Sequence, residues 1–219
     1  MNCYRCKTWP CECPDGITLI HGDCRDVLPL LEPGSVDLVL TDPPYGIGSW
    51  SATGGNSISE AEAKDINRWD VRPSDGLIRA VVAKAEYSIV WGGNYLCNAL
   101  GPFRTPLIWD KKIRGMHFAD GEMAWTNFDF GALRIFELAA GASDARGARV
   151  HPAQKPLALM SWAIGLVKTE PQTILDPFAG SGTTGRACKD LGRKCIMIEI
   201  EEKYVKIAAA RLRQEVLFP

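Results

Sequence analysis

The sequence lacks any apolar run long enough to cross a bilayer, and its first residues, MNCYRCKTWP, lack the apolar stretch of a signal peptide. It also lacks an excess of positive charge, because 25 Lys and Arg face 26 Asp and Glu. These absences predict a cytoplasmic protein with no membrane segment. They exclude a broadly basic surface, so any nucleic-acid surface must be a local patch or be pooled between two subunits.

Internal repeats and low-complexity linkers are also missing, and 219 residues suit a single α/β domain. Several short runs are apolar at every position and are followed by turn residues. Apolar residues at every position are typical of parallel strands buried on both faces. These runs are 17–20, 36–40, 87–90, 107–109, 173–175 and 195–198. Stretches with helical character lie between them at 74–84, 157–168, 183–191 and 201–214. The alternation predicts an open, mostly parallel central sheet with helices on both faces.

Two segments depart from this pattern. Residues 46–73 are long, polar and rich in Gly and Ser, and residues 112–150 have a mixed composition to which we assign no regular structure. A loop of such length inside a compact domain is usually functional or disordered.

A glycine-rich turn follows the run 173–175 and reads Asp176-Pro-Phe-Ala-Gly-Ser-Gly182, directly before an expected helix. Glycine permits a close approach of ligand to backbone, and a helix N-terminus offers free N–H groups. Glu199 ends the next apolar run, where its carboxylate can accept hydrogen bonds from ribose hydroxyls. The combination indicates a nucleoside-containing cofactor, whereas the alternative is an ordinary turn with a surface glutamate.

A second motif, Asp42-Pro43-Pro44-Tyr45, follows the run 36–40. Two prolines stiffen the chain and remove two N–H donors, so the Asp42 carboxylate and the Pro43 carbonyl can both face outward as acceptors. Tyr45 adds a flat ring. Two acceptors beside a ring suit a planar amine, such as that of adenine or cytosine, attacking the sulfonium methyl of S-adenosylmethionine. The alternative is a proline-rich turn that merely closes a strand.

These two motifs, together with His151-Pro-Ala-Gln-Lys-Pro156, resemble the amino-methyltransferases of DNA. The order, with the Asp42 motif before the glycine-rich motif, is similar to the circularly permuted β-group. The resemblance spans about residues 17–214 and implies a Rossmann-like methyltransferase fold. Ala153 departs from the family, which more often has threonine there.

The resemblance implies roles for the motif residues. Asp42, Pro43, Pro44 and Tyr45 would hold a base flipped out of double-stranded DNA. The residues implied in binding S-adenosylmethionine are Asp23, Lys155, Asp176, Pro177, Phe178, Gly180, Ser181, Gly182, Thr183 and Glu199.

The segment 111–150 is expected to recognise the DNA target, and residues 46–73 to cover the DNA or the base. Basic residues in the recognition segment are candidate contacts to phosphates or bases, or are simply solvated surface charges. They are Lys111, Lys112, Arg114, Arg134, Arg146 and Arg149. The scarcity of basic surface makes a homodimer that pools two DNA surfaces plausible.

Four cysteines lie within the first 13 residues: Cys3, Cys6, Cys11 and Cys13. Four thiolates can close a tetrahedral zinc site, and C-x2-C is a usual half-site, so residues 1–16 predict a small structural zinc unit ahead of a methyltransferase domain at 17–219. Free thiols or redox sensitivity are the alternatives. Cys24, Cys97, Cys188 and Cys195 are expected in the core, and the three histidines form no evident site.

The resemblance favours adenine N6 as the target, because the first motif begins with aspartate, whereas serine would favour cytosine N4. The alternatives are N4-cytosine methylation, the same chemistry on RNA or a protein amide, and a nucleic-acid-binding protein without activity. RNA and protein enzymes usually carry asparagine at the position of Asp42. No nuclease motif is evident, which favours a stand-alone enzyme of a restriction pair or a phage orphan.

Overall fold

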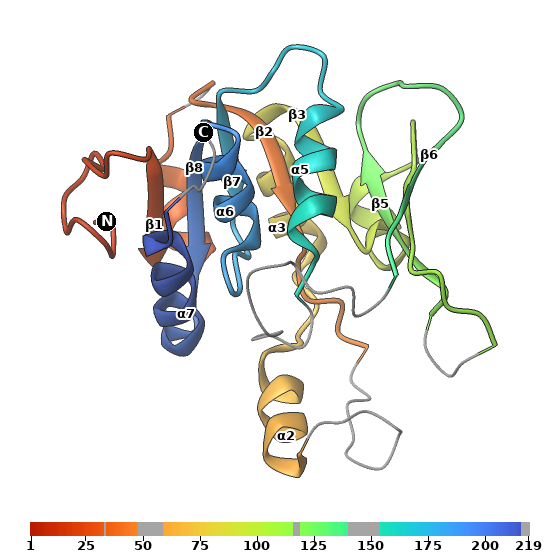
Figure 1. Ribbon diagram of the computed structural model, residues 1–219, viewed down its shortest axis with the longest axis horizontal. Coiled ribbons are helices and arrows are strands. Elements are labelled where there is room, and N and C mark those ends of the chain that lie inside the picture. Colours follow the sequence, from red (N-terminus) through yellow and green to blue (C-terminus); the bar gives the residue numbers. More distant parts are fainter. Residues whose placement is uncertain (33, 48–58, 116–118, 140–153, 216–219) are drawn as a thin grey trace.

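The computed structural model describes residues 1–32, 34–47, 59–115, 119–139 and 154–215 (Figure 1). Within these ranges the chain forms one eight-stranded sheet in the order β1-β8-β7-β2-β3-β5-β4-β6. The strands are β1 (Ile17–His21), β2 (Val36–Thr41), β3 (Ala85–Trp91), β4 (Leu107–Asp110), β5 (Gly121–Thr126), β6 (Arg134–Glu137), β7 (Thr173–Asp176) and β8 (Lys194–Glu199). Only β5 runs antiparallel to its neighbours among these strands, so the predicted mostly parallel sheet is confirmed.

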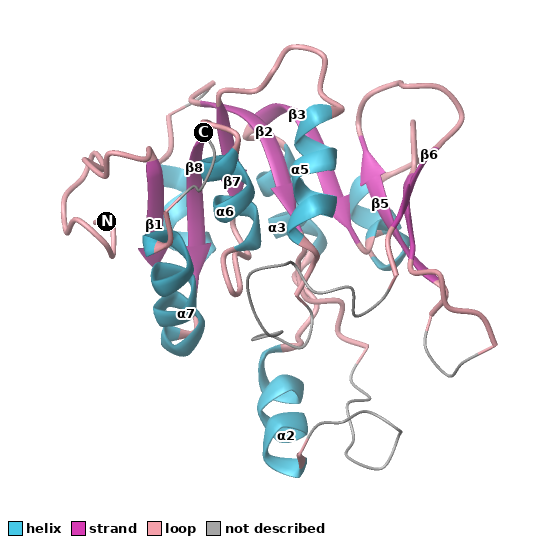
Figure 2. Cartoon of the chain, viewed as in Figure 1, coloured by secondary structure: helices cyan, strands magenta, loops and turns pink. Residues whose placement is uncertain are grey.

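Helices cover both faces of the sheet (Figure 2). One face carries α5 (Leu157–Gly165), α6 (Thr183–Asp190) and α7 (Glu202–Arg213), and the other carries α1 (Cys24–Val27), α3 (Asp75–Val82) and α4 (Cys97–Leu100). Successive side chains of β2 point to opposite faces of the sheet and belong to two hydrophobic cores. Leu38 and Leu40 pack in the same core as Leu159, while Val39 packs in the same core as Val81. The continuous apolar runs of the sequence therefore reflect burial on both sides of the sheet.

All six predicted strands and all four predicted helices are present among the described residues. The expectation of an irregular segment at 46–73 is wrong for its second half, where Glu60–Trp69 forms α2. Two further strands, β5 and β6, arise in the segment to which the sequence assigned no structure. Short 3-10 turns, η1 (Leu28–Leu30) and η2 (Gly93–Tyr95), complete the described elements.

Helix α2 projects beyond the carboxyl ends of the parallel strands (Figure 1). It is tied to α7 by an ion pair between Arg68 and Glu201 at 2.6 Å and by an edge-on contact between the rings of Trp69 and Tyr204. No helix in the described part of the chain is long and apolar enough to cross a membrane.

Candidate active site

The Asp42 motif and the glycine-rich motif lie side by side at the carboxyl ends of two central strands. β2 and β7 are parallel neighbours, with Leu38 opposite Ile174 and Val39 opposite Leu175. Asp42 follows β2, while Asp176 ends β7 and begins the glycine-rich turn. From this pair of strands the chain continues outward in opposite directions, to β3 on one side and to β8 on the other. This is the switch point at which open α/β sheets bind ligands.

The Asp42 carboxylate is held by two side chains. Tyr45 donates its hydroxyl to Oδ1 at 2.5 Å, and the Lys155 ammonium donates to Oδ2 at 2.5 Å. Lys155 also lies 2.9 Å from Glu122, which in turn pairs with Lys111 at 2.6 Å. Two carboxylates and two ammonium groups therefore alternate and balance one another, which is how charges are retained in a largely buried cluster.

Burial governs the protonation of this cluster. Desolvation raises the pKa of Asp42 despite the attraction of Lys155, and it raises the pKa of the Tyr45 hydroxyl well above its usual value. Although burial opposes its charge, the carboxylates of Asp42 and Glu122 raise the pKa of Lys155. Burial also opposes ionisation of Glu122, yet Lys155 and Lys111 lower its pKa to about 2. The Lys155 ammonium therefore stays charged and pairs with both acids.

The Tyr45 ring is fixed by its packing. A Cβ added to Gly92 would lie 1.9 Å from Cε1 of Tyr45, so only glycine leaves room for the ring at that position. Tyr95 stacks on Tyr45 with ring centroids 4.9 Å apart and an interplanar angle of 21°. The half-exposed Tyr95 extends the flat apolar surface that Tyr45 offers.

Asp70 holds the backbone of the same motif. Its Oδ1 accepts the N–H groups of Tyr45 and Gly46, each at 3.0 Å, and Asp70 is only 8% exposed. Asp70 directly follows α2, so this helix anchors the turn that carries Asp42 and Tyr45. Asp70 was not predicted as a site residue, since an isolated aspartate 25 residues from Tyr45 belongs to no motif.

The buried carboxylate of Asp176 stabilises the glycine-rich turn. Thr41 donates to its Oδ1 at 2.7 Å and Thr184 donates to its Oδ2 at 2.5 Å, which links β2, β7 and α6. Burial raises the pKa of Asp176 to about 6. Its carboxylate therefore holds the turn in shape, a role beyond the cofactor contact that the family resemblance implies.

The turn itself has the features of a nucleoside cradle. Gly182 precedes α6 with φ at +78°, and an added Cβ would lie 2.8 Å from the Cβ of Ala208. Glu199, at the tip of β8, accepts the N–H of Gly180 at 2.7 Å and that of Glu201 at 2.8 Å. Burial raises the pKa of Glu199 to about 7. A backbone that glycines leave uncovered, at a helix N-terminus and beside a carboxylate that can accept ribose hydroxyls, fits an adenosine-containing cofactor.

The remaining predicted cofactor residues lie as follows. Phe178 and Pro177 are in the same turn, while Thr183 accepts a hydrogen bond from Arg211 at 2.7 Å, and Ser181 lies buried beside it. Asp23 caps α1 by accepting the Arg25 N–H at 2.8 Å and also binds the Arg25 side chain. Lys155 lies in the Asp42 cluster, so the structure brings it to the predicted base site. His151 is outside the described residues.

The family model described as DNA methylase (N6_N4_Mtase) matches residues 85–210, more than half of the chain. The chain belongs to the N6/N4 DNA methylase family. The resemblance inferred from the motifs is thereby confirmed, together with the methyl donor of such enzymes, S-adenosylmethionine.

Curated relatives of this DNA methylase align over nearly its full length. Type II methyltransferase M2.LlaDCHI of Lactococcus lactis subsp. cremoris is 29% identical, over 90% of this chain and 89% of the relative. Type II methyltransferase M.HinfI of Haemophilus influenzae is 26% identical, over 90% of this chain and 68% of the relative.

Solved structures share its fold. A complex of M1.HpyAVI with S-adenosylmethionine has a TM-score of 0.60 at 21% identity and covers 90% of this chain and all of the other. The cytosine-N4-specific PvuII DNA methyltransferase has a TM-score of 0.62 at 18% identity and covers 93% of this chain and 88% of the other. The predicted methyltransferase fold is therefore confirmed.

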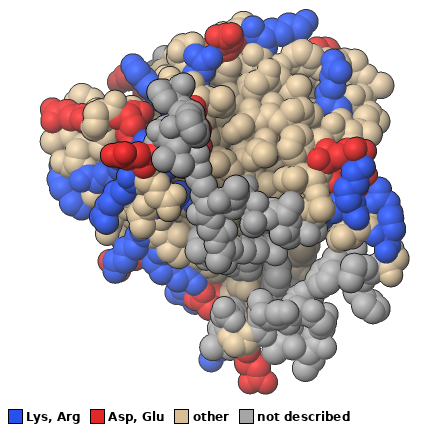
Figure 3. Space-filling model, viewed as in Figure 1, with Lys and Arg blue, Asp and Glu red and all other residues tan. Residues whose placement is uncertain are grey.

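Most of the predicted DNA contacts of this methylase that the structure describes form ion pairs with acidic residues of the protein itself. Lys111 pairs with Glu122, Lys112 with Glu137 at 2.6 Å, and Arg114 with Asp110 at 2.8 Å. Arg134 is exposed and lies over the ring of Phe130. Basic and acidic groups are interspersed on the described surface of the face in Figure 3. Arg146 and Arg149 are outside the described residues.

Proposed function

We propose that this DNA methylase transfers a methyl group to the N6 amine of adenine in a specific sequence of double-stranded DNA, with the target base flipped out of the helix. The observation that supports this proposal is the Asp42 carboxylate, which follows β2 and is held between Tyr45 and Lys155. A base within a duplex is stacked and paired, so it must be extruded before Asp42 can reach its amine.

The chain's own residues prepare the amine for attack. The Asp42 carboxylate and the Pro43 carbonyl would accept its two N–H groups, which favours a pyramidal nitrogen with an available lone pair. The flat surface of Tyr45 and Tyr95 would support the face of the base. S-adenosylmethionine supplies an electrophilic methyl group when bound at the turn before α6. Asp42, whose pKa is raised by burial, can take the proton that the amine must lose.

We assign Lys155 to positioning. Its ammonium holds Oδ2 of Asp42 and is itself held by Glu122, so the carboxylate has one fixed orientation before the base arrives. Fixed hydrogen-bond acceptors require no reorganisation during the reaction. Lys155 thus acts on the base through Asp42 instead of binding the cofactor.

Adenine is favoured over cytosine by Asp42 itself, because the family resemblance links aspartate at this position to adenine N6 and serine to cytosine N4. The recognition of a DNA sequence falls to the segment 111–150, part of which forms β5 and β6. Because the described cations of this segment are largely paired with acids, we propose that a homodimer supplies the DNA surface. Sedimentation of the free and DNA-bound protein measures its subunit number.

The deciding experiment is transfer of labelled methyl from S-adenosylmethionine to duplex DNA, with RNA and protein as competing acceptors. The wild type should yield N6-methyladenine in DNA, and Asp42→Ala should lose this product while binding the cofactor normally. Recovery of N4-methylcytosine would overturn the base assignment and keep the role of Asp42. Methylation of RNA or protein alone, or no transfer at all, would overturn the proposed function.

A further inference from the structure

The N-terminal cysteines lie at the outer edge of the sheet, apart from the candidate active site. β1 is an edge strand whose only partner among the described strands is β8. Residues 3–16 lie along its free side, where Tyr4 donates its N–H to the Leu19 carbonyl and Arg5 donates to the Ile17 carbonyl at 3.1 Å. The segment thus covers a strand edge that would otherwise offer unpaired backbone groups.

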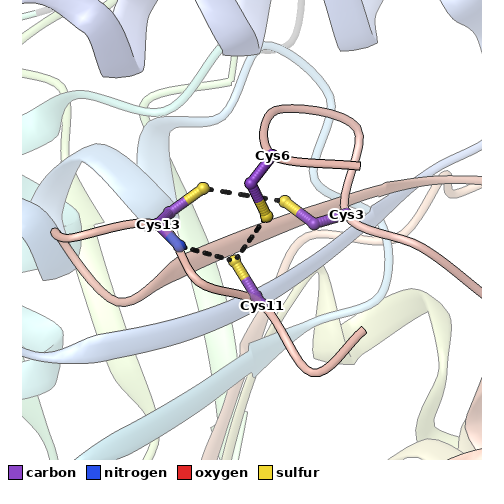
Figure 4. Close-up of side chains that lie close together, drawn as sticks. All are labelled: Cys3, Cys6, Cys11 and Cys13. Atoms are coloured by element: carbon purple, nitrogen blue, oxygen red, sulfur yellow. Dashed lines mark hydrogen bonds between the residues drawn. The ribbon is translucent and has the colours of Figure 1, made fainter. Parts of the chain in front are cut away.

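The four sulfur atoms of this segment converge on one point (Figure 4). All four lie within 4.8 Å of one another, with Cys3 and Cys13 at 3.9 Å and Cys6 and Cys11 at 3.7 Å. A zinc ion bound tetrahedrally at about 2.3 Å from each sulfur places the sulfurs about 3.8 Å apart. The separations are far too long for disulfides, whose sulfurs lie about 2.05 Å apart.

The backbone of the segment aims these sulfurs inward. Lys7 has a φ of +67° and donates its N–H to the Cys3 carbonyl at 2.8 Å, which closes a tight turn around the first pair. The Cys13 N–H approaches the Cys11 sulfur at 3.5 Å, the kind of contact that stabilises a thiolate.

Charge around the cluster suits a tetrathiolate ion. Four thiolates with one divalent cation carry a net charge of −2, and the positively charged Arg5 stands between Cys3 and Cys6 in the same segment. Arg5 is itself fixed by two hydrogen bonds to Asp15, at 2.8 and 2.7 Å. Cys3 is fully buried, although the segment is too short to form a core of its own. A metal ion is a physical reason for a short segment to hold a fixed shape.

We propose that Cys3, Cys6, Cys11 and Cys13 bind one structural zinc ion that fastens residues 3–16 to the free edge of β1. The site has four protein ligands and leaves no position for a substrate, so it is not catalytic. Its role is to hold β1, whose carboxyl end leads to Asp23 at the cofactor edge. The proposal is independent of the base that the enzyme methylates.

The first test measures metal in the untagged, full-length protein purified without chelator. We expect one zinc per chain by elemental analysis, released when a mercurial titrates four thiols. Replacement by Co²⁺ should give the intense visible absorption of a tetrahedral thiolate site. Less than about 0.2 equivalents of any metal, or one equivalent of iron in place of zinc, would overturn the proposal.

The second test compares Cys13→Ser and Cys13→His with Cys97→Ser. Cys97 is a matched control because it lies outside the cluster and is exposed, so the expectation that it lies in the core is wrong. Cys13→Ser should lose zinc and lower the melting temperature by about 5 °C or more. Cys13→His should regain metal because histidine is also a zinc ligand. Full zinc occupancy in Cys13→Ser would contradict the assignment, and the metal content of the wild type decides the matter if this variant does not fold.

Discussion

Lys155 donates a hydrogen bond of 2.5 Å to the carboxylate of Asp42, although 113 residues separate them in the chain. The contact joins the end of β2 to the segment before α5. It gives the candidate catalytic carboxylate a fixed orientation and a counter-charge, and Glu122 also pairs with the Lys155 ammonium.

Lys155→Met should remove the cation that Asp42 and Glu122 share, which leaves one cation, Lys111 beside Glu122, against two carboxylates. Breaking a buried pair in this way costs on the order of 3 kcal/mol of folding free energy. Methyl transfer should fall by about 100-fold, because Asp42 would protonate or turn away. Urea unfolding and turnover on duplex DNA measure the two effects.

The matched control is Lys206→Met, since Lys206 pairs with Glu202 at an exposed site. It should change stability by less than about 1 kcal/mol. Equal losses of unfolding free energy and of methyl transfer in the two lysine variants would contradict a specific role for the contact between Lys155 and Asp42.

Asp70→Ala should loosen the turn that carries Asp42 and Tyr45. It leaves the N–H groups of Tyr45 and Gly46 without their acceptor, at a cost of about 1–3 kcal/mol for each group that stays buried. We expect kcat to fall while the Kd for S-adenosylmethionine changes little, because the hydrogen bonds of Asp70 to Tyr45 and Gly46 lie on the base side of the site. Asp70→Asn keeps an acceptor oxygen and should recover part of the rate.

The control for Asp70 is Asp129→Ala, which removes an exposed ion pair with Arg104. An equal rise in the cofactor Kd and fall in kcat for Asp70→Ala would contradict a role confined to the Asp42 turn.

Glu199 should make both stability and cofactor binding depend on pH near neutrality. Burial raises its pKa to about 7 in the folded protein, against about 4.3 in an unfolded chain. The stability contributed by this group is therefore fully present below about pH 4.3 and is lost as pH rises through about 7. Asp176, with a pKa of about 6, acts in the same direction.

Cofactor affinity should change in the opposite sense, because an ionised Glu199 is the stronger acceptor for ribose hydroxyls. We expect calorimetric titration to show tighter binding at pH 8 than at pH 6. Glu199→Gln should weaken binding and flatten this dependence, whereas the exposed Glu32→Gln should retain it. A pH dependence that persists in Glu199→Gln would assign the effect to another group.

Among the predicted DNA contacts that the structure describes, Arg134 is the most available to a phosphate. It is exposed on β6, while Lys111, Lys112 and Arg114 pair with acids. Arg134→Ala should weaken binding to all duplexes alike and reduce the slope of log K against log salt by about 1. Fluorescence anisotropy over a salt series measures both. Loss of affinity for a single sequence would instead indicate that Arg134 recognises a base. Arg104→Ala is the control, because Arg104 is an exposed arginine that was not predicted to contact DNA.

Much of the fold followed from local patterns. Apolar runs such as 36–40 and 173–175 became neighbouring parallel strands because a strand buried on both faces needs apolar residues at every position. β5 was not predicted, because Gly121–Thr126 has neither a continuous apolar run nor a clear alternation. Its place between β3 and β4 depends on pairing with strands far along the chain.

The sequence by itself contained the patterns on which the proposed chemistry depends: the Asp42 motif, the glycine-rich turn before α6, Glu199 at the next strand tip and four closely spaced cysteines. Each is a local pattern that can be recognised without the fold. Only the tertiary structure decided that Lys155 holds Asp42 and is itself held by Glu122, that Asp70 anchors the Tyr45 backbone, and that the cysteines lie on the free edge of β1. These contacts join residues far apart in the chain, and the folding of the sheet is what brings such residues together.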